Sequence, residues 1–302
     1  MDIILIVIGF AGLMLGGDWL VSGAVGLARR WGVSPMVIGL TVVGFGTSMP
    51  ELVTSVQAAL AGSPGIAVGN VVGSNIANIL LILGAAAALA PVAAPWRGIR
   101  WDGLVMLAVS IGAAALILTE GLGRLAGLGL VATLAVYLFA TARRTDGSVG
   151  IASEPSAPVW KLAAGFVLLI AGARALVIGA VGLAGSLGVP EAVIGLTIVA
   201  IGTSLPELTA SIIAARRGAA DMAIGNVVGS NIFNILGVLG ITALIAPVGG
   251  GGAVGLRDIA VMLAAAGALL ALSAMVGRIS RGAGIAMMVL YAGYLGWLAV
   301  AV

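Results

Sequence analysis

Apolar segments long enough to cross a bilayer follow one another along almost the whole chain. Of the 302 residues, 61% are hydrophobic and 8% are charged, whereas a soluble domain carries about 25% charged residues. Because backbone N–H and C=O groups need internal partners inside a bilayer, apolar segments of about 20 residues form transmembrane helices. The chain is therefore expected to be an all-α membrane protein that crosses the lipid bilayer many times.

Ten such helices with short connections are predicted. They are expected near residues 3–28, 34–60, 66–90, 102–119, 124–142, 160–185, 190–215, 222–246, 258–276 and 282–301. The longest connection is polar, with Gly, Ser and Pro, and is typical of a linker. The apolar run after Asp2 lacks the basic region of a cleaved signal peptide, so it is predicted to be the first membrane helix.

The parts of the chain before and after this linker resemble each other. Glu51 and Glu207 are 156 residues apart, and the same separation relates Asn78 to Asn234. Because five helices in each part is an odd number, the two parts would cross the membrane in opposite directions. Inverted repeats of this kind are typical of secondary transporters, whose substrate site lies between the repeats. The predicted units are a first five-helix repeat (1–142), a linker (143–159) and a second, inverted repeat (160–302).

The basic residues indicate which side of the membrane is cytoplasmic. With ten helices, two basic residues, Arg124 and Arg257, fall on one side and eleven on the other. The eleven are Arg29, Arg30, Arg97, Arg100, Arg143, Arg144, Lys161, Arg216, Arg217, Arg278 and Arg281. The linker would then be cytoplasmic, and both termini would be extracytoplasmic. The small basic surplus indicates loops near anionic lipid and no binding of nucleic acid.

One further basic residue, Arg174, is left inside the sixth predicted helix. It occupies the repeat position of Asp18 in the first helix. These opposite charges are expected to pair with each other or to reach solvent.

An acidic residue lies within the second and the seventh apolar segments, in the same setting. Residues 44–51 read Gly-Phe-Gly-Thr-Ser-Met-Pro-Glu, and residues 200–207 read Ala-Ile-Gly-Thr-Ser-Leu-Pro-Glu. An acidic side chain in the middle of the bilayer costs at least about 3 kcal/mol. No Lys, Arg or His in either stretch offers compensation, so a bound cation is the simplest partner for Glu51 and Glu207.

The prolines of these stretches add further oxygen atoms. Pro50 and Pro206 lack an N–H group, so each is predicted to interrupt its helix and to free the carbonyl four residues earlier. Oxygen atoms are the ligands of Na⁺ and Ca²⁺ in proteins. Thr47 lies one helical turn before Glu51, so hydroxyl, carbonyl and carboxylate would face the same space. The equivalent pair in the second repeat is Thr203 and Glu207.

A second repeated stretch carries neutral oxygen atoms. Residues 69–78 read Gly-Asn-Val-Val-Gly-Ser-Asn-Ile-Ala-Asn, and residues 225–234 differ from them only by Phe in place of Ala. The small residues favour close helix packing, while the polar residues at four-residue spacing favour a site, and both roles are expected. Asn70 and Asn226 are expected to support interrupted backbone. The side chains predicted to line the site are Ser74, Asn78, Ser230 and Asn234.

These two motifs, each present twice, resemble the paired repeats of the Ca²⁺/cation antiporter superfamily, and most of all its prokaryotic sodium/calcium exchangers. The resemblance extends over nearly all of the chain. It implies ten helices, of which the second, third, seventh and eighth surround the ions. It also implies that the first and sixth helices slide across this core to switch access, and that the site holds either one Ca²⁺ or several Na⁺.

Transferred by position, the resemblance makes Glu51 and Glu207 the shared carboxylates. Thr47 and Thr203 would give their carbonyls to Ca²⁺. The other implied ligands are Ser48, Ser204, Ser74, Ser230, Asn78 and the carbonyls of Gly44 and Ala200. Well-studied sodium/calcium exchangers often carry Asp where this chain has Asn234, which leaves two carboxylates in the centre. Two negative charges balance one Ca²⁺, whereas three Na⁺ would leave a surplus positive charge, so the counter-ion and the stoichiometry stay open.

The predicted function is Na⁺/Ca²⁺ antiport by alternating access, without a cofactor. The alternative is an H⁺/Ca²⁺ exchanger on the same fold, with Glu51 and Glu207 carrying the protons, and a third reading is a cation channel. An enzyme is not expected, because the chain has no Cys, no His and no paired Asp residues. The protein is expected to act as a monomer in the plasma (inner) membrane.

Overall fold

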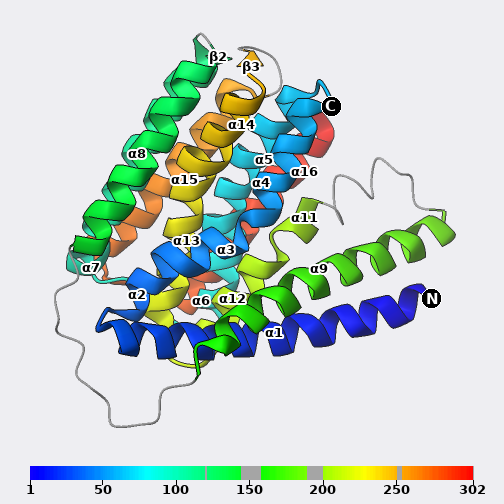
Figure 1. The fold of residues 1–302 in the computed structure, drawn as a ribbon, viewed down its shortest axis with the longest axis vertical. Coiled ribbons are helices and arrows are strands. Elements are labelled where there is room, and N and C mark those ends of the chain that lie inside the picture. The colour runs from blue at the N-terminus through cyan, green and yellow to red at the C-terminus, as the bar shows by residue number, and fades with distance from the viewer. Residues whose placement is uncertain (120, 144–157, 189–199, 250–253, 302) are drawn as a thin grey trace.

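The computed structural model describes residues 1–302 except 120, 144–157, 189–199, 250–253 and 302 (Figure 1). The helices of the first part are α1 (Asp2–Trp31), α2 (Pro35–Ile38), η1 (Gly39–Val43), α3 (Gly44–Thr47), α4 (Met49–Leu60), α5 (Pro64–Ala77), η2 (Asn78–Leu83), α6 (Gly84–Leu89), α7 (Trp96–Leu118) and α8 (Arg124–Arg143). Those of the second part are α9 (Trp160–Ser186), α11 (Ala200–Thr203), α12 (Leu205–Arg216), α13 (Ala220–Phe233), η4 (Asn234–Leu239), α14 (Gly240–Ile245), α15 (Leu256–Met275) and α16 (Arg281–Ala301). The η segments are π-helices that continue the preceding α-helix.

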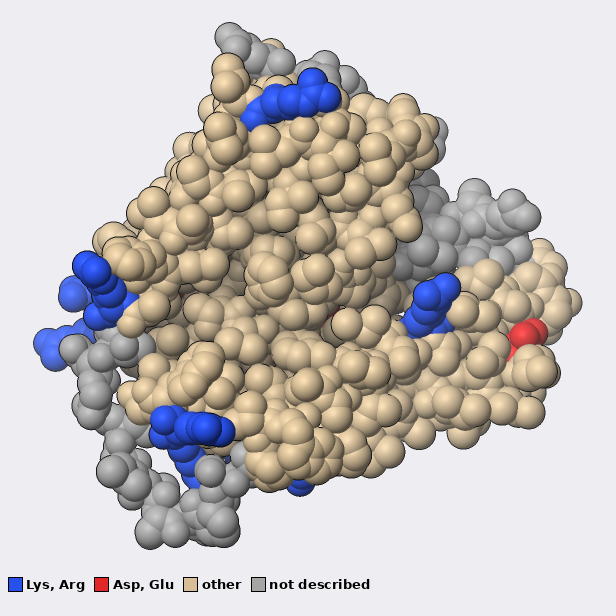
Figure 2. Space-filling model, viewed as in Figure 1, with Lys and Arg blue, Asp and Glu red and all other residues tan. Residues whose placement is uncertain are grey.

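The described part of the chain is an all-α integral membrane protein. It contains seven helices that are long and apolar enough to span a membrane, or eight if Pro35–Thr47 and Met49–Leu60 form one bent span. The face in Figure 2 is almost entirely uncharged, with basic side chains in a few separate places and acidic atoms visible at one edge. This surface suits lipid, because a charge facing the bilayer interior is costly.

Most helix ends lie within three residues of the sequence-based expectation, and the fourth helix is the exception. It was expected from residue 102 and begins at Trp96, directly after its N-cap Pro95. The polar residues Arg97 and Arg100 in its first turns lower the hydropathy without ending the helix. Likewise α8 includes Arg143, the expected first residue of the linker, while 144–157 and the start of the seventh expected helix lie outside the described residues.

The segments α5–η2–α6 and α13–η4–α14 form the centre of the molecule. The buried share of their most apolar stretch is 78% and 83%, respectively. In the other spanning helices this share is below 40%. Glycine permits this packing: a Cβ atom added at Gly225 of α13 would lie 2.5 Å from the carbonyl oxygen of Met36. The centre is therefore the part of the protein that is shielded from lipid.

The helices α1 and α9 lie side by side and antiparallel along one flank of this centre (Figure 1). Their backbones touch: a Cβ atom added at Gly16 would lie 2.6 Å from the backbone nitrogen of Leu169, and one at Gly172 would lie 2.7 Å from that of Leu13. Glycine recurs every seven residues on both helices, which lets them approach along their length. The glycines of this interface are Gly9, Gly16, Gly23, Gly165, Gly172 and Gly179.

Two short strand pairs join the first part of the chain to the second. β1 (Val92–Ala93) pairs antiparallel with β4 (Arg278–Ile279), and β2 (Gly121–Leu122) pairs antiparallel with β3 (Val248–Gly249). Each pair joins one strand from the first part to one from the second.

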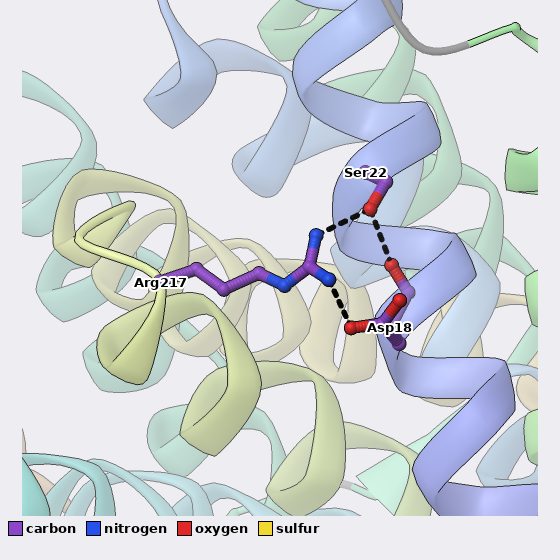
Figure 3. A network of polar contacts seen from close by, with 3 residues as sticks. All are labelled: Asp18, Ser22 and Arg217. Carbon is purple, nitrogen blue, oxygen red and sulfur yellow. Dashed lines mark hydrogen bonds and ion pairs between the residues drawn. The ribbon is translucent and has the colours of Figure 1, made fainter.

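An ion pair joins α1 to the end of α12 (Figure 3). The Arg217 guanidinium pairs with the Asp18 carboxylate and donates a hydrogen bond to the Ser22 hydroxyl, which itself donates to the Asp18 carbonyl at 2.7 Å. Pairing of Asp18 with Arg174 was therefore the wrong alternative. The reason is the antiparallel packing of α1 and α9, which sets Arg174 along α9 away from Asp18 and leaves Arg217 within reach.

Candidate cation site

Both Gly-Thr-Ser-x-Pro-Glu stretches interrupt a helix at the serine. The chain bends by 40° between α3 and α4, and Ser48 at the junction has φ −84° and ψ 9°. Ser204 takes the same conformation between α11 and α12, with φ −89° and ψ 3°. Pro50 and Pro206 each occupy the second position of the helix that follows, where a missing N–H group is tolerated. Each break therefore sets a glutamate in the first turn of a new helix, Glu51 or Glu207.

Each of these glutamates is bonded by the serine of the opposite motif. The Ser48 hydroxyl donates to Oε1 of Glu207 at 3.0 Å, and the Ser204 hydroxyl donates to Oε1 of Glu51 at 3.4 Å. Both glutamates are 1% exposed. The two helix breaks thus face each other across the centre of the molecule and hold two carboxylates in one place.

Three buried oxygen atoms at this place lack a hydrogen-bond partner. They are Oε2 of Glu51, Oε2 of Glu207 and Oδ1 of Asn234. A buried polar atom without a partner is costly, and two of these atoms belong to carboxylates. In the described part of the chain no three Asp, Glu, His or Cys residues come together. An oxygen site with two carboxylates and neutral oxygens suits a hard cation such as Na⁺ or Ca²⁺.

The asparagines that begin the second motif support the broken helices. Nδ2 of Asn70 donates to the Glu51 carbonyl at 3.2 Å and to Ser55 Oγ at 2.9 Å. Nδ2 of Asn226 makes the equivalent bonds to the Glu207 carbonyl and to the hydroxyl of Ser211. These bonds fix the backbone that carries each glutamate.

The other residues predicted for the site belong to α3 and α11, which precede the two helix breaks, and to the central helices α5–η2 and α13–η4. Ser230 donates to the Gly44 carbonyl at 3.3 Å, which joins two of the expected ligands to each other. Thr47 is fully buried and donates to the Val43 carbonyl at 3.0 Å. Ser74 is buried, and Thr203 lines a cavity described below. Ala200 is the first residue of α11.

Sequence reasoning assigned no role to Asn75 and Asn231, although both are 1% exposed at the centre of the site. Asn78 donates from Nδ2 to Oδ1 of Asn231 at 2.9 Å, and Asn234 donates from Nδ2 to Oδ1 of Asn75 at 3.1 Å. Their recurrence at the same repeat position was the available signal. It was not used because Asn75 and Asn231 fall outside the four-residue spacing of Asn70, Ser74 and Asn78 and of its repeat.

A cavity of about 570 Å³ ends at the two helix breaks. Met49, Pro50, Thr203 and Pro206 from the two motifs line it, together with residues of α4 and α9 that include Arg174. This cavity is large enough for water molecules and borders the residues that flank Glu51 and Glu207.

The arrangement has close relatives among known proteins. The family model described as sodium/calcium exchanger protein matches residues 1–142 and 157–300. The putative antiporter CaxA of Alkalimonas amylolytica is 40% identical over 96% of both chains, and the sodium/calcium exchanger MaX1 of Methanosarcina acetivorans is 33% identical over 78% of this chain and 80% of its own.

A solved structure of the sodium-calcium exchanger NCX_Mj, soaked with zero Na⁺ and Ca²⁺, matches with a TM-score of 0.88 and 34% identity over 98% of both chains. The family match includes both Gly-Thr-Ser-x-Pro-Glu motifs, and the structural match covers nearly the whole chain. The chain therefore belongs to the sodium/calcium exchanger protein family.

Proposed function

We propose that the protein is a secondary active antiporter that exchanges Na⁺ for Ca²⁺ at the site between Glu51 and Glu207. The observation that carries this proposal is the set of buried oxygen atoms without partners on Glu51, Glu207 and Asn234. A bound cation would be coordinated by these oxygens, which have no hydrogen-bond partner within the described part of the protein. Because the same oxygens would hold either Ca²⁺ or Na⁺, the two ions compete, and their competition couples the two fluxes.

The ligand set in this proposal is the one expected from the sequence. Glu51 and Glu207 give the charge, and helix breaks at Ser48 and Ser204 bring neutral oxygens beside them. The neutral ligands are the hydroxyls of Ser48, Ser204, Ser74 and Ser230, the amide oxygens of Asn78 and Asn234, and the carbonyls of Thr47, Thr203, Gly44 and Ala200.

Ten helices in two inverted five-helix repeats (1–142 and 160–302) complete the proposed architecture. The reciprocal strand pairs and the reciprocal Ser–Glu hydrogen bonds support it, because a two-fold relation between the repeats produces contacts in such pairs. The excess of basic residues on one side favours a cytoplasmic linker and extracytoplasmic termini in the plasma (inner) membrane. Since both repeats of one chain contribute to the site, the protein would act as a monomer.

Exchange of H⁺ for Ca²⁺ is the second candidate, and one observation favours it. Asn234 is uncharged, so two carboxylates face the ions and three Na⁺ would leave an uncompensated positive charge. Two protons on Glu51 and Glu207 would balance one Ca²⁺ without such a surplus.

Reconstitution into liposomes decides between these candidates. Vesicles loaded with Na⁺ at equal pH on both sides are expected to take up ⁴⁵Ca²⁺, and a pH gradient without Na⁺ is not. Uptake driven by the pH gradient alone would select the H⁺/Ca²⁺ exchanger. Ca²⁺ flux that needs neither gradient would indicate a channel.

A further inference from the structure

Four buried amides cross at the centre of the molecule, where α5 and η2 meet α13 and η4. Asn75, Asn78, Asn231 and Asn234 are each 1% exposed. An amide has a donor end and an acceptor end, and only the oxygen end can bind a cation. Which end faces the site therefore decides whether Asn78 and Asn234 attract or repel an ion.

Backbone carbonyls determine the orientation of two of these amides. A carbonyl oxygen can only accept a hydrogen bond, so the Asn75 amide must turn Nδ2 toward the Asn231 carbonyl, at 3.3 Å. Asn231 turns Nδ2 toward the Asn75 carbonyl at 3.4 Å, and its Nδ2 also lies 3.6 Å from the sulfur of Met106, a second acceptor. Consequently Oδ1 of each points the other way.

Those two oxygens in turn orient the amides of the site. Oδ1 of Asn75 accepts from Nδ2 of Asn234, and Oδ1 of Asn231 accepts from Nδ2 of Asn78. The donor end of each site amide is thereby occupied. In Asn234 the oxygen end is left without a partner, as a cation ligand requires.

We propose that Asn75 and Asn231 are positioning residues that turn the oxygens of Asn234 and Asn78, respectively, toward the transported cation. This inference rests on the proposed cation site. It explains how an amide can serve at position 234, because its orientation is set by a hydrogen bond that crosses between the two parts of the chain.

A double-mutant cycle tests the assignment. Asn75→Leu removes the acceptor for Asn234, so the Ca²⁺ concentration for half-maximal ⁴⁵Ca²⁺ uptake is expected to rise about tenfold. In an Asn234→Asp background the same substitution is expected to change it less than twofold, because a carboxylate presents oxygen in either orientation. Asn231→Leu, which acts through Asn78, is the matched control and should keep its full effect in the Asn234→Asp background.

Equal effects of Asn75→Leu in both backgrounds would overturn the proposal, since a purely structural role does not depend on the chemistry of residue 234. If Asn75→Leu fails to insert, Asn75→Ala is tested in the same cycle. Ca²⁺-dependent thermal stabilisation of the wild-type protein separates the two levels of failure. Its absence would refute the cation site itself, whereas its presence with equal effects would refute only the positioning role.

A second inference concerns the ion pair of Asp18 with Arg217 and is carried by a different observation. The cavity that reaches the site lies between α4 and α9, and the repeat-equivalent place lies between α12 and α1. There the helices are in contact: a Cβ atom added at Gly17 of α1 would lie 2.9 Å from the Thr209 methyl group. At the exposed edge of this contact, Arg217 binds Asp18 and Ser22, with the Arg217 and Asp18 side chains 43% and 44% exposed (Figure 3).

The repeat equivalents of these three residues cannot form the same contact. Asp18, Ser22 and Arg217 correspond to Arg174, Ile178 and Ala61. Arg174 and Ile178 line the open cavity. The two access states of an inverted-repeat transporter would therefore differ, because the ion pair is available to one of them only.

We infer that Asp18, Ser22 and Arg217 form a latch that favours the access state in which the α4–α9 cavity is open. The latch must break before α1 moves relative to α12. This inference rests on the alternating-access part of the proposed function.

Single cysteines report on the latch cleanly, because the chain has no native Cys. Ile213→Cys lies on the closed side, and Gln57→Cys is its repeat equivalent in the cavity. Asp18→Asn is expected to raise maleimide labelling of Ile213→Cys about fivefold and to lower that of Gln57→Cys. The exchanged pair Asp18→Arg with Arg217→Asp should restore the original pattern, and Arg216→Gln is the matched control.

Unchanged labelling of both cysteines in Asp18→Asn would overturn the latch. A change of maleimide labelling in the same direction at both cysteines would also overturn it, because a shift between access states changes the two in opposite directions. Na⁺-driven ⁴⁵Ca²⁺ uptake by the cysteine-free protein tests the exchange function separately.

Discussion

The Ser48 hydroxyl donates a hydrogen bond to Oε1 of Glu207, 159 residues away, at 3.0 Å. The mirror contact joins Ser204 to Glu51 at 3.4 Å. Each carboxylate is thus oriented by the helix break of the other part of the chain. A cation between them would be held by both parts at once, so its binding and release would depend on how the two parts are placed.

Glu51→Gln and Glu207→Gln are each expected to abolish exchange. Glutamine keeps the size of the side chain and removes the charge that would balance Ca²⁺. The measurement is ⁴⁵Ca²⁺ uptake into Na⁺-loaded proteoliposomes, with Asp221→Asn in the first turn of α13 as an acidic control outside the site. Normal uptake by either glutamine variant would contradict the assignment of the site.

Ser48→Ala is expected to weaken Ca²⁺ binding by about threefold to tenfold, because it removes a hydrogen bond to a buried carboxylate. Ser110→Ala in α7 is the control, since the Ser110 hydroxyl is buried and bonds to the Met106 carbonyl of its own helix. The half-saturating Ca²⁺ concentration of uptake distinguishes the two variants. An equal response of both would assign Ser48 a role in packing alone.

Asn234→Asp is expected to strengthen binding of Na⁺ more than binding of Ca²⁺. A third carboxylate compensates the surplus positive charge that three Na⁺ would leave beside Glu51 and Glu207. The Na⁺ dependence of Ca²⁺ efflux measures this change, which should be several-fold in half-saturating Na⁺ concentration. Gln57→Glu, in the cavity but away from the two helix breaks, controls for added charge.

Gly16→Ala is expected to lower the apparent melting temperature in detergent, because the added methyl group would meet the backbone of Leu169. Overpacking of this kind costs about 1–3 kcal/mol. Gly112→Ala in α7 is the matched control, since Gly112 is exposed and, among the described residues, nothing beyond its own stretch of helix lies within 4 Å of its added Cβ. Equal melting temperatures for the two variants would show that the α1–α9 interface accommodates the added methyl group without loss of stability.

Local sequence was sufficient for most of the described helix ends and for the residues that we propose carry the ligand oxygens. Apolar length predicted the spans, because a helix in a bilayer satisfies its own backbone. The proline two residues after each break, and the repeat of Glu51 at Glu207, pointed to the two carboxylates. The start of α7 was missed because Arg97 and Arg100 are polar, yet they fit the first turns of a helix that begins after Pro95.

The sequence by itself determined that the chain is helical, that it lies in a membrane, and that it carries two acids in matching settings. Only the tertiary structure decided which side chains contact each other: Ser48 with Glu207, Asn234 with Asn75, and Asp18 with Arg217 instead of with Arg174. The physical reason is the distance along the chain over which each interaction acts. Hydropathy and helix geometry act over a few residues, whereas these contacts depend on the crossing of helices more than 150 residues apart.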